Sequence, residues 1–342
     1  MKILITGGCG FVGSNISIFL KKKMKNVDIY TLDNLTRLGS AENLKRLKLN
    51  NIKNYKIDIE NYKKIRRLKK FNLIIDCCAE PAIEVSKKDP DKVFDTNLVG
   101  TYNILKKCIK DKSNLIFLSS SRVYSINSLR KIVNKKKINK PLKIRKKINE
   151  DFDTSSICSL YGFTKLSSEK LIKEIFFTNN LKYIINRFGV IAGPWQFGKQ
   201  DQGFVTLWVA KHLLNKKLQY IGFGGNGYQV RDIIHINDVC DIIFTQIKKL
   251  KKISNDTFNI GGGTKNSISL RNLTLKCQKL TGNKLKIRKI LKTSSYDIPY
   301  YVTDNYKIFK TYRWKPKIKL NNTISDIYKW LIENKFIWKY FK

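Results

Sequence analysis

The stretch that decides the fold is Lys2-Ile3-Leu4-Ile5-Thr6-Gly7-Gly8-Cys9-Gly10-Phe11-Val12-Gly13. Its first five residues include an apolar run that predicts a buried strand, and its glycines follow the spacing G-x-x-G-x-x-G. Glycine permits a tight turn and the close approach of another backbone or a ligand. Where such a turn opens a helix, free N–H groups at the helix N-terminus attract a phosphate group. The stretch therefore predicts a strand, a phosphate-binding turn and a helix.

A carboxylate follows the next predicted strand. Asp33 comes directly after Asp28–Leu32 and twenty residues after Gly13. At this spacing a carboxylate accepts hydrogen bonds from the adenosine ribose of a dinucleotide and repels a 2′-phosphate. The pattern therefore favours NAD over NADP. Arg37 keeps the alternative open, because an arginine near the ribose accommodates a 2′-phosphate.

Short apolar runs alternate with amphipathic stretches along the chain. Strands are predicted at Lys2–Thr6, Asp28–Leu32, Tyr55–Ile57, Leu73–Asp76, Leu115–Leu118, Tyr183–Arg187 and Thr257–Ile260, and helices near 160–176, 238–248 and 323–334. Parallel strands joined by right-handed helical crossovers make a doubly wound sheet. We therefore expect an α/β protein with a Rossmann-type doubly wound parallel sheet and a smaller C-terminal substrate-binding lobe.

Loops rich in glycine, glutamine and aromatic residues distinguish the second half of the chain. This composition is typical of a substrate-binding lobe. The expected boundaries place an NAD-binding Rossmann domain at 1–188, with 236–262 returning to it. The expected lobe comprises 189–235 and 263–342. The two parts therefore interleave in the sequence.

The chain is strongly basic, with a net charge of +42 over 342 residues. Of its 68 basic residues 56 are Lys and 12 are Arg, and the Lys is scattered over the whole sequence. Specific readers of nucleic acid depend on Arg, so this pattern indicates an AT-rich coding bias and no specific nucleic-acid partner. The segment Arg130–Lys147 holds ten basic residues. It predicts a solvated loop, with a basic flap near the active site as the alternative.

The cysteines and the apolar runs indicate the compartment. Seven cysteines, odd in number and without a C-x-x-C pair, predict reduced and mostly buried thiols. The start of the chain has no signal-peptide pattern, and no stretch approaches the ~18 apolar residues that span a bilayer. We therefore expect a cytoplasmic protein without a membrane partner. His212 and His235 have no partner at metal-ligand spacing, so no metal site is expected.

A phenol and an ammonium group lie four residues apart in Tyr161-Gly162-Phe163-Thr164-Lys165, on one face of the predicted helix. A free tyrosine ionises near pH 10, but a fixed cation beside it favours the phenolate. Tyr161 is therefore a candidate acid/base. The strand end Ser119-Ser120-Ser121 offers hydroxyl groups to a substrate carbinol or carbonyl. These residues together predict a hydride-transfer site.

These features resemble the extended short-chain dehydrogenase/reductase family over nearly the whole chain. The resemblance is carried by the glycine turn, Asp33, Asp58-Ile59, Ala79-Glu80, Asn97, the serine-rich strand end, Tyr161, Lys165 and the segment from Arg231-Asp232 to His235. Within the family the chain is most similar to the CDP-paratose 2-epimerases, also called CDP-tyvelose epimerases, through Gly193-Pro194-Trp195-Gln196-Phe197, Asp201-Gln202-Gly203-Phe204 and Gly227-Tyr228-Gln229-Val230-Arg231-Asp232. Two residues depart from the family pattern. Many relatives have glycine at the position of Glu80, and glycine is usual at the position of Ser125.

The resemblance implies a role for each matching residue. Tyr161 would be the acid/base, Lys165 its electrostatic partner, and Ser120 the helper hydroxyl, with Ser121 as the alternative. NAD contacts are implied for Gly7, Gly10, Phe11, Val12, Gly13, Asp33, Asn34, Asp58, Ile59, Ala79, Glu80, Asn97, Ser119, Tyr161 and Lys165. Substrate contacts are implied for Ser120, Ser121, Arg187, Trp195, Gln196, Gln202, Gly203 and Arg231. Arg231 would hold the diphosphate, because a guanidinium bonds phosphate oxygens in pairs.

The implied activity is that of an NAD-dependent nucleotide-sugar epimerase. It would oxidise the sugar transiently to a keto sugar and return the hydride to the opposite face. A UDP-sugar 4-epimerase is the main alternative. A 4,6-dehydratase is disfavoured, because Ser121-Arg122 stand where that group has an acid pair. A non-catalytic dinucleotide-binding or RNA-binding module remains a further alternative. The resemblance also implies a homodimer or homotetramer.

Overall fold

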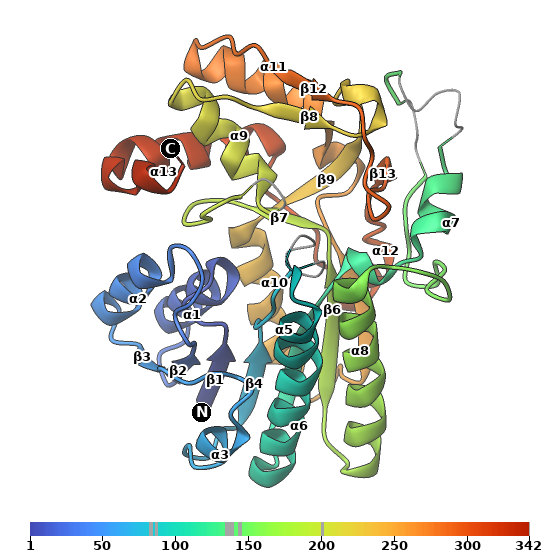
Figure 1. Cartoon of the computed structure of the whole chain (residues 1–342). Helices are drawn as coiled ribbons and strands as arrows, with labels where there is room; N and C mark the ends of the chain where they lie inside the picture. The colour runs from blue at the N-terminus through green and yellow to red at the C-terminus, as the bar shows by residue number, and fades with distance from the viewer. Residues whose placement is uncertain (82–84, 86–87, 134–139, 143–145, 200–201, 342) are drawn as a thin grey trace. The chain divides into compact units, whose positions relative to one another are not determined.

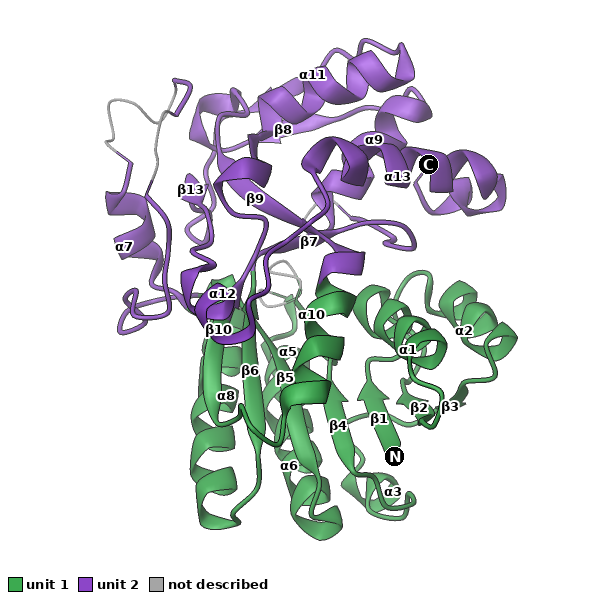
Figure 2. Ribbon diagram, turned by 180° about the vertical axis from the view of Figure 1, so that it is seen from behind, with its two compact units in different colours: residues 1–123, 159–188, 239–258 green, residues 124–158, 189–238, 259–342 purple. Residues whose placement is uncertain are grey.

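The structure is a computed structural model that describes residues 1–81, 85, 88–133, 140–142, 146–199 and 202–341. The chain divides into two compact units. Unit 1 comprises residues 1–123, 159–188 and 239–258, and unit 2 comprises 124–158, 189–238 and 259–342 (Figure 2). The sequence placed 124–158 with the first domain, whereas the structure groups this segment with unit 2.

Unit 1 contains most of a seven-stranded sheet with the strand order β10-β6-β5-β4-β1-β2-β3. Its strands are β1 (Lys2–Thr6), β2 (Asp28–Leu32), β3 (Lys53–Tyr55), β4 (Leu73–Asp76), β5 (Asn114–Ser120), β6 (Tyr183–Phe188) and β10 (Asp256–Ile260). The pairings of β1 with β2 and β4, of β2 with β3, and of β5 with β4 and β6 are parallel. The expected Rossmann-type sheet is confirmed. Its order reverses at β1, and such a switch point is where open α/β sheets bind ligands.

The helices of unit 1 connect these strands (Figure 1). They are α1 (Phe11–Lys23), α2 (Ser40–Leu49), α3 (Tyr62–Ile65), α5 (Pro90–Phe94), α6 (Gly100–Asp111), α8 (Leu160–Thr178) and most of α10 (Ile236–Lys249), with a π-helix, η1, at Asp95–Val99 and a 3₁₀ turn, η2, at Ser121–Val123. Apolar side chains of β1, β4 and β5 pack against α6 and α8 in a continuous buried core. This packing fixes α8, which carries Tyr161 and Lys165, against the sheet.

One predicted strand of unit 1 is displaced. The sequence placed it at Tyr55–Ile57, but β3 runs from Lys53 to Tyr55. The backbone N–H of Ile57 donates to the carbonyl of Tyr55, so the chain turns there instead of continuing along the sheet. The other strands expected in this unit lie within a few residues of their predicted bounds.

Unit 2 is built from shorter elements. They are α7 (Ile126–Lys131), β7 (Val190–Ala192), α9 (Phe204–Leu213), β8 (Gln219–Ile221), η4 (Phe223–Gly225), β9 (Val230–His235), η5 (Thr264–Asn266), β11 (Ser267–Ser269), α11 (Leu270–Thr281), β12 (Arg288–Ile290), β13 (Tyr300–Tyr301), α12 (Tyr306–Tyr312), α13 (Leu320–Glu333) and η6 (Lys335–Tyr340). Strand β9 pairs with β7, β11 and β13, and β8 pairs with β12. Helix α13 confirms the predicted closing helix, and its Trp330 packs against Phe197 and Phe341.

Long-range backbone bonds explain why the segment 124–158 belongs to unit 2. Ile148 donates to the carbonyl of Val302 and accepts from the N–H of Asp304. The Glu150 carboxylate accepts from the N–H of Asn259 at 2.7 Å. Of the basic segment, residues 134–139 and 143–145 lie outside the described residues. Arg130, at its start, donates to backbone carbonyls at 2.9 Å, including that of Asp297.

Candidate active site

The glycine turn has the geometry that the sequence predicts. Gly7 has a φ of +59°, in the left-handed region that favours glycine. A Cβ added at Gly13 would lie 2.3 Å from the carbonyl oxygen of Gly7, so a side chain does not fit there. The N–H of Gly10 donates to the same Gly7 carbonyl at 3.0 Å. The turn is therefore closed on itself at the start of α1.

The N-terminus of α1 carries no side-chain cap, because its N-cap residue is Gly10. Its first turn also contains no acidic residue. An uncapped helix start presents backbone N–H groups and partial positive charge. This arrangement suits a pyrophosphate.

Asp33 lies beside the glycine turn at the end of β2. Its Oδ2 accepts from the N–H of Cys9 at 3.0 Å, and its Oδ1 accepts from the N–H of Leu35 at 2.8 Å. Burial raises the pKa of the Asp33 carboxyl, although these backbone bonds and the nearby Arg37 oppose the rise. The structure therefore places this carboxylate next to the expected phosphate-binding turn.

Asn34 and Asp58 lie together in the same part of unit 1. The Asn34 side-chain amide donates to Oδ2 of Asp58 at 2.7 Å, and Oδ1 of Asp58 accepts from the N–H of Glu60. Ile59, the next residue, is buried and would contact a Cβ added at Gly100. These contacts bring Asp58 and Ile59, two of the predicted NAD-binding residues, close to the end of β2.

Asn97 links the loop after β4 to helix α8. It lies in η1 and is fully buried. Its Oδ1 accepts from the N–H of Glu80 at 2.7 Å, and its Nδ2 donates to the carbonyl of Glu80 at 3.1 Å and to the Thr164 hydroxyl at 3.3 Å. π-Helical turns of this kind are frequent at functional sites. Asn97 therefore positions the chain from Ala79 to Glu80 through hydrogen bonds of its own.

Tyr161 and Lys165 lie one helical turn apart near the start of α8, which Ser159 caps by accepting from the N–H of Gly162. Lys165 is only 1% exposed, and its ammonium lies 4.3 Å from the ring centroid of Phe117 on β5. Within the described part of the chain, neither the Tyr161 hydroxyl nor the Lys165 ammonium forms a hydrogen bond or an ion pair. A buried ammonium without an acceptor is costly. This arrangement is what a site that receives hydroxyl groups from a ligand requires.

Ser120 stands at the end of β5. Its Oγ accepts from the N–H of Arg122 at 3.2 Å, so the 3₁₀ turn η2 fixes this hydroxyl group. Ser120 is partly exposed, as are Ser121 and Tyr161. All three predicted catalytic residues, Tyr161, Lys165 and Ser120, therefore belong to unit 1.

Ser119 and Arg187 have protein partners inside unit 1. The Ser119 hydroxyl donates to Oε1 of Glu169 at 2.5 Å. Nη2 of Arg187 lies 2.7 Å from Oε2 of Glu169, and its Nε donates to both oxygens. All three side chains are buried. Direct contacts of Ser119 with NAD and of Arg187 with substrate therefore stay predictions. The sequence reasoning missed Glu169, the shared partner of these two predicted site residues. The sequence contained a signal for Glu169: Tyr161, Lys165 and Glu169 follow one another at intervals of four residues and therefore lie on one face of the helix.

The predicted substrate residues of unit 2 lie in two segments. Gln196 is held within its loop, because its amide donates to the carbonyl of Ile191 and its oxygen accepts from the Thr206 hydroxyl. The Trp195 ring packs 5.7 Å from the ring of Trp330. Gln202 pairs its backbone with Lys199, and Gly203 has a φ of +76° before α9. Asp201, between these residues in the motif, lies outside the described residues.

Arg231, the predicted diphosphate ligand, lies in β9. Its Nη1 donates to the carbonyl of Val230 at 2.8 Å, and its Nη2 donates to that of Ile298 at 2.6 Å. These bonds fix the guanidinium between β9 and the segment before β13. Arg231 is partly exposed, and its contact with a diphosphate stays a prediction.

Comparisons with known proteins decide the family. The sequence profile of the NAD dependent epimerase/dehydratase family matches residues 3–261. The chain belongs to this family. The expected likeness to extended short-chain dehydrogenases/reductases is thereby confirmed, as are NAD as the cofactor and the enzyme class, NAD-dependent nucleotide-sugar epimerases.

Relatives of this family match the chain over almost its whole length. CDP-paratose 2-epimerase of Salmonella typhi is 29% identical over 96% of this chain and 99% of that protein. UDP-glucuronate 4-epimerase of Thermodesulfobacterium geofontis is 27% identical over 97% of this chain and 96% of that protein. The crystal structure of UDP-glucuronic acid 4-epimerase from Bacillus cereus in complex with UDP-glucuronic acid and NAD has a TM-score of 0.80 and 24% identity, covering 97% and 99% of the two chains.

Asp232 is a buried carboxylate next to Arg231 in this family member. Its Oδ2 accepts from the N–H of Gly263 at 2.9 Å, and a Cβ added at Gly261 would lie 2.4 Å from the same oxygen. Burial raises the pKa of Asp232, although the hydrogen bond from the N–H of Gly263 opposes the rise. Asp232 therefore anchors β9 to the loop after β10 in a site where its charge is poorly solvated.

Replacing Asp232 by asparagine should change how stability depends on pH. Because the folded pKa is raised, the carboxyl group stabilises the fold fully below its ordinary pKa, and this contribution is lost as the pH rises through the folded pKa. Asparagine does not titrate. We therefore measure the free energies of unfolding of Asp232→Asn and of the wild type by urea denaturation. The value for the variant minus that for the wild type should increase between pH 4 and pH 8. A difference that stays constant with pH would contradict a raised pKa for the Asp232 carboxyl group.

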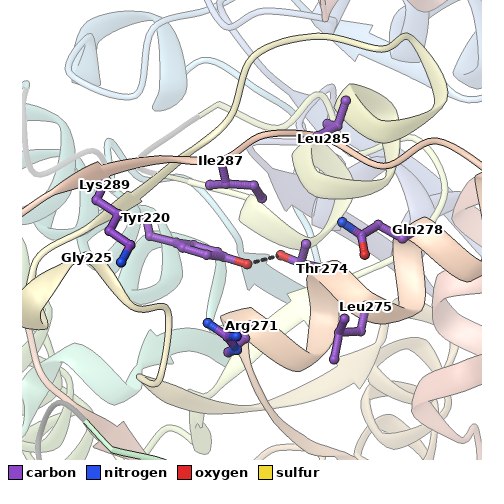
Figure 3. A pocket seen from close by; sticks show the side chains of 9 residues that line it. All are labelled: Tyr220, Gly225, Arg271, Thr274, Leu275, Gln278, Leu285, Ile287 and Lys289. Carbon is purple, nitrogen blue, oxygen red and sulfur yellow. Dashed lines mark hydrogen bonds between the residues drawn. The ribbon is translucent and has the colours of Figure 1, made fainter.

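A shallow pocket of about 270 Å³ lies within unit 2, lined by β8, α11 and β12 (Figure 3). The Tyr220 hydroxyl donates to Oγ1 of Thr274 at 2.7 Å across its floor. Arg271 and Lys289 supply its cationic groups. No residue predicted for cofactor or substrate lines this pocket.

Three further observations concern the predicted environment of the enzyme. Among the described residues, no group of three or more His, Cys, Asp and Glu side chains could hold a metal ion. The helices in that same part of the chain are all too short or too polar to cross a membrane. All seven cysteines are free, and five of them are buried, as the sequence predicts.

Proposed function

We propose that the protein is an NAD-dependent nucleotide-sugar epimerase that acts most like a CDP-paratose 2-epimerase. The observation that carries this proposal is the pair Tyr161 and Lys165, whose hydroxyl and ammonium groups form no hydrogen bond or ion pair among the described residues. The family supplies NAD as the cofactor. A phenol and a buried ammonium beside a bound dinucleotide are the groups that a carbinol–carbonyl interconversion needs.

The residues present fit NAD. The uncapped start of α1 and the glycine turn, packed so closely that no Cβ fits at Gly13, would provide a pyrophosphate cradle. Asp33 would accept hydrogen bonds from the hydroxyl groups of the adenosine ribose. Lys165 would donate hydrogen bonds to the hydroxyl groups of the ribose at the nicotinamide end. When bound, NAD supplies the acceptor and donor of a hydride.

The protein's own groups would handle the proton. Tyr161 would take the proton from the sugar C2 hydroxyl and later return a proton to the same oxygen, with Lys165 one helical turn away. Ser120, fixed by Arg122, would orient that oxygen. Because the proton and the hydride both return to the sugar, no net oxidation occurs. The configuration at C2 inverts when the keto sugar turns its other face.

The substrate assignment rests on the relatives. The CDP-paratose 2-epimerase of Salmonella typhi and the UDP-glucuronate 4-epimerase of Thermodesulfobacterium geofontis cover the chain equally well. The motifs around Trp195, Gln202 and Arg231 favour the first, with Arg231 binding the diphosphate. UDP-sugar 4-epimerisation is the second candidate. We also propose that the enzyme acts in the cytoplasm, which its free cysteines support.

A homodimer or homotetramer is part of the proposal. Several large apolar side chains of unit 1 are exposed on α5, η1, α6 and α8, among them Phe94, Val99, Tyr102, Phe163 and Phe177. These helices contact one another. Burial of this surface against a second copy would remove apolar area from water.

A substrate panel tests the proposed function. The purified protein is incubated with NAD and, separately, with CDP-paratose, UDP-glucose, UDP-galactose and UDP-glucuronate, and the products are read by NMR. We expect CDP-paratose to be inverted at C2. Conversion of a UDP sugar at C4 in its place would support the second candidate. If every sugar stays unaltered, the proposed function fails.

A further inference from the structure

An ion pair joins the loops that follow β2 and β4 in unit 1. Nη1 of Arg37 lies 3.0 Å from both carboxylate oxygens of Glu80, and the two side chains are 34% and 20% exposed. Strands β2 and β4 flank β1 on its two sides. The pair therefore lies where both neighbours of the glycine-turn strand end, at the switch point of the sheet.

Both partners are held in place by their backbones. The fully buried Asn97 accepts from the N–H of Glu80 and donates to its carbonyl. The carbonyl of Arg37 accepts from the N–H of Ser40 at 3.0 Å and from its hydroxyl at 2.7 Å, which fixes Arg37 to the start of α2. The backbones that carry the carboxylate and the guanidinium are thus fixed, so backbone movement does not separate the pair.

The charge of Arg37 acts on the carboxylate that selects the cofactor. Arg37 opposes the burial effect on the pKa of Asp33, so the two groups are close enough to interact. An arginine so near to the expected ribose position would serve a 2′-phosphate well, since its fork bonds phosphate oxygens in pairs. With Glu80 present, the three groups Asp33, Arg37 and Glu80 sum to one negative charge, which repels a phosphate dianion.

We propose that Glu80 enforces the use of NAD over NADP by holding Arg37 in an ion pair, away from a 2′-phosphate. Glu80 is then a specificity-determining residue and not a direct ligand of the cofactor. The inference rests on the NAD dependence of the family and is independent of the sugar substrate. It also resolves the ambiguity of Arg37, whose presence near Asp33 would otherwise allow NADP.

Cofactor titrations of nucleotide-free protein test this inference without any sugar. NADH and NADPH binding are followed by fluorescence for the wild type, Glu80→Gln and Glu80→Ala. Glutamine preserves the volume of the side chain, and alanine also removes the remaining hydrogen-bond acceptor. We expect both variants to bind NADPH about tenfold more tightly than the wild type, the scale of one charge pair near the surface. Their dissociation constants for NADH should stay within about threefold of the wild type on the same scale.

The matched control is the double variant Arg37→Met, Glu80→Gln. If the gain acts through Arg37, the double variant binds NADPH as weakly as the wild type, and high salt reduces the gain of the single variant. Thermal melting verifies that each variant folds. Unchanged NADPH affinity in both folded single variants would overturn the proposal, and so would a gain that persists without Arg37. A selective loss of NADH binding would also overturn it, because Glu80 would then be a direct cofactor ligand.

Discussion

Replacing Tyr161 by phenylalanine is expected to lower turnover by about 10²–10⁴-fold, the usual contribution of a general acid/base. The variant loses the hydroxyl group that takes and returns the proton, whereas the ring and its packing remain. NAD binding should change little, because the glycine turn, Asp33 and Lys165 are untouched. The measurement is the rate of epimer formation by NMR at saturating NAD, together with the nucleotide content of the purified protein.

Tyr306→Phe is the matched control for this variant. Tyr306 is the first residue of α12 and is 66% exposed, so it loses a hydroxyl group of the same kind outside the predicted site residues. We expect its turnover to equal that of the wild type. A Tyr161→Phe variant that retains NAD and full turnover would remove Tyr161 from the mechanism.

Replacing Gly13 by alanine is expected to abolish the retention of NAD during purification. The added Cβ would lie 2.3 Å from the Gly7 carbonyl oxygen and 2.9 Å from its carbon. These atoms are backbone and cannot move aside like a flexible side chain. Overpacking of this kind costs about 1–3 kcal/mol, and relief requires the turn to open, which disperses the N–H groups that would bind the pyrophosphate. We expect at least a hundredfold weaker NAD binding, equivalent to about 3 kcal/mol.

Gly282→Ala separates this steric effect from the general cost of replacing glycine. Gly282 caps the end of α11 with a φ of +75°, and an added Cβ would meet nothing within 4 Å. The variant should lose about 1 kcal/mol of stability from the left-handed backbone alone and should retain NAD. The two proteins are compared by thermal melting and by titration with NADH. Equal NADH affinities would show that the turn tolerates a side chain at Gly13.

Local patterns predicted the elements that build the cofactor half of the site. Strands β1, β2 and β4 have the bounds read from the sequence, because each is a short apolar run next to a turn signal. The glycine turn and the pair Tyr161 and Lys165 could be predicted equally well, because their geometry follows from spacing within a single helix or turn. Strand β3 was misplaced by two residues, because the apolar residue Ile57 follows a turn at Tyr55 that no local pattern marks.

Contacts between distant residues could not be predicted. Arg187 resembled a substrate ligand, but its partner Glu169 lies 18 residues away on another element. Glu80 resembled a cofactor ligand, although its carboxylate meets Arg37, which is 43 residues away. The segment 124–158 lies within the predicted first domain, yet Ile148 pairs with Thr303 in unit 2. In each case the sequence indicated the kind of residue, and the fold determined which distant residue it contacts.

The measurement that tests the central claim most directly is the fate of the hydrogen at the epimerised carbon. The protein is incubated with CDP-paratose in D₂O, and the product is examined by NMR. An NAD-dependent epimerase in which Tyr161 exchanges only the hydroxyl proton returns the same hydrogen to carbon. We therefore predict inversion at C2 without deuterium at that carbon. Inversion accompanied by deuterium at C2 would contradict the account, since it would require removal of that hydrogen as a proton.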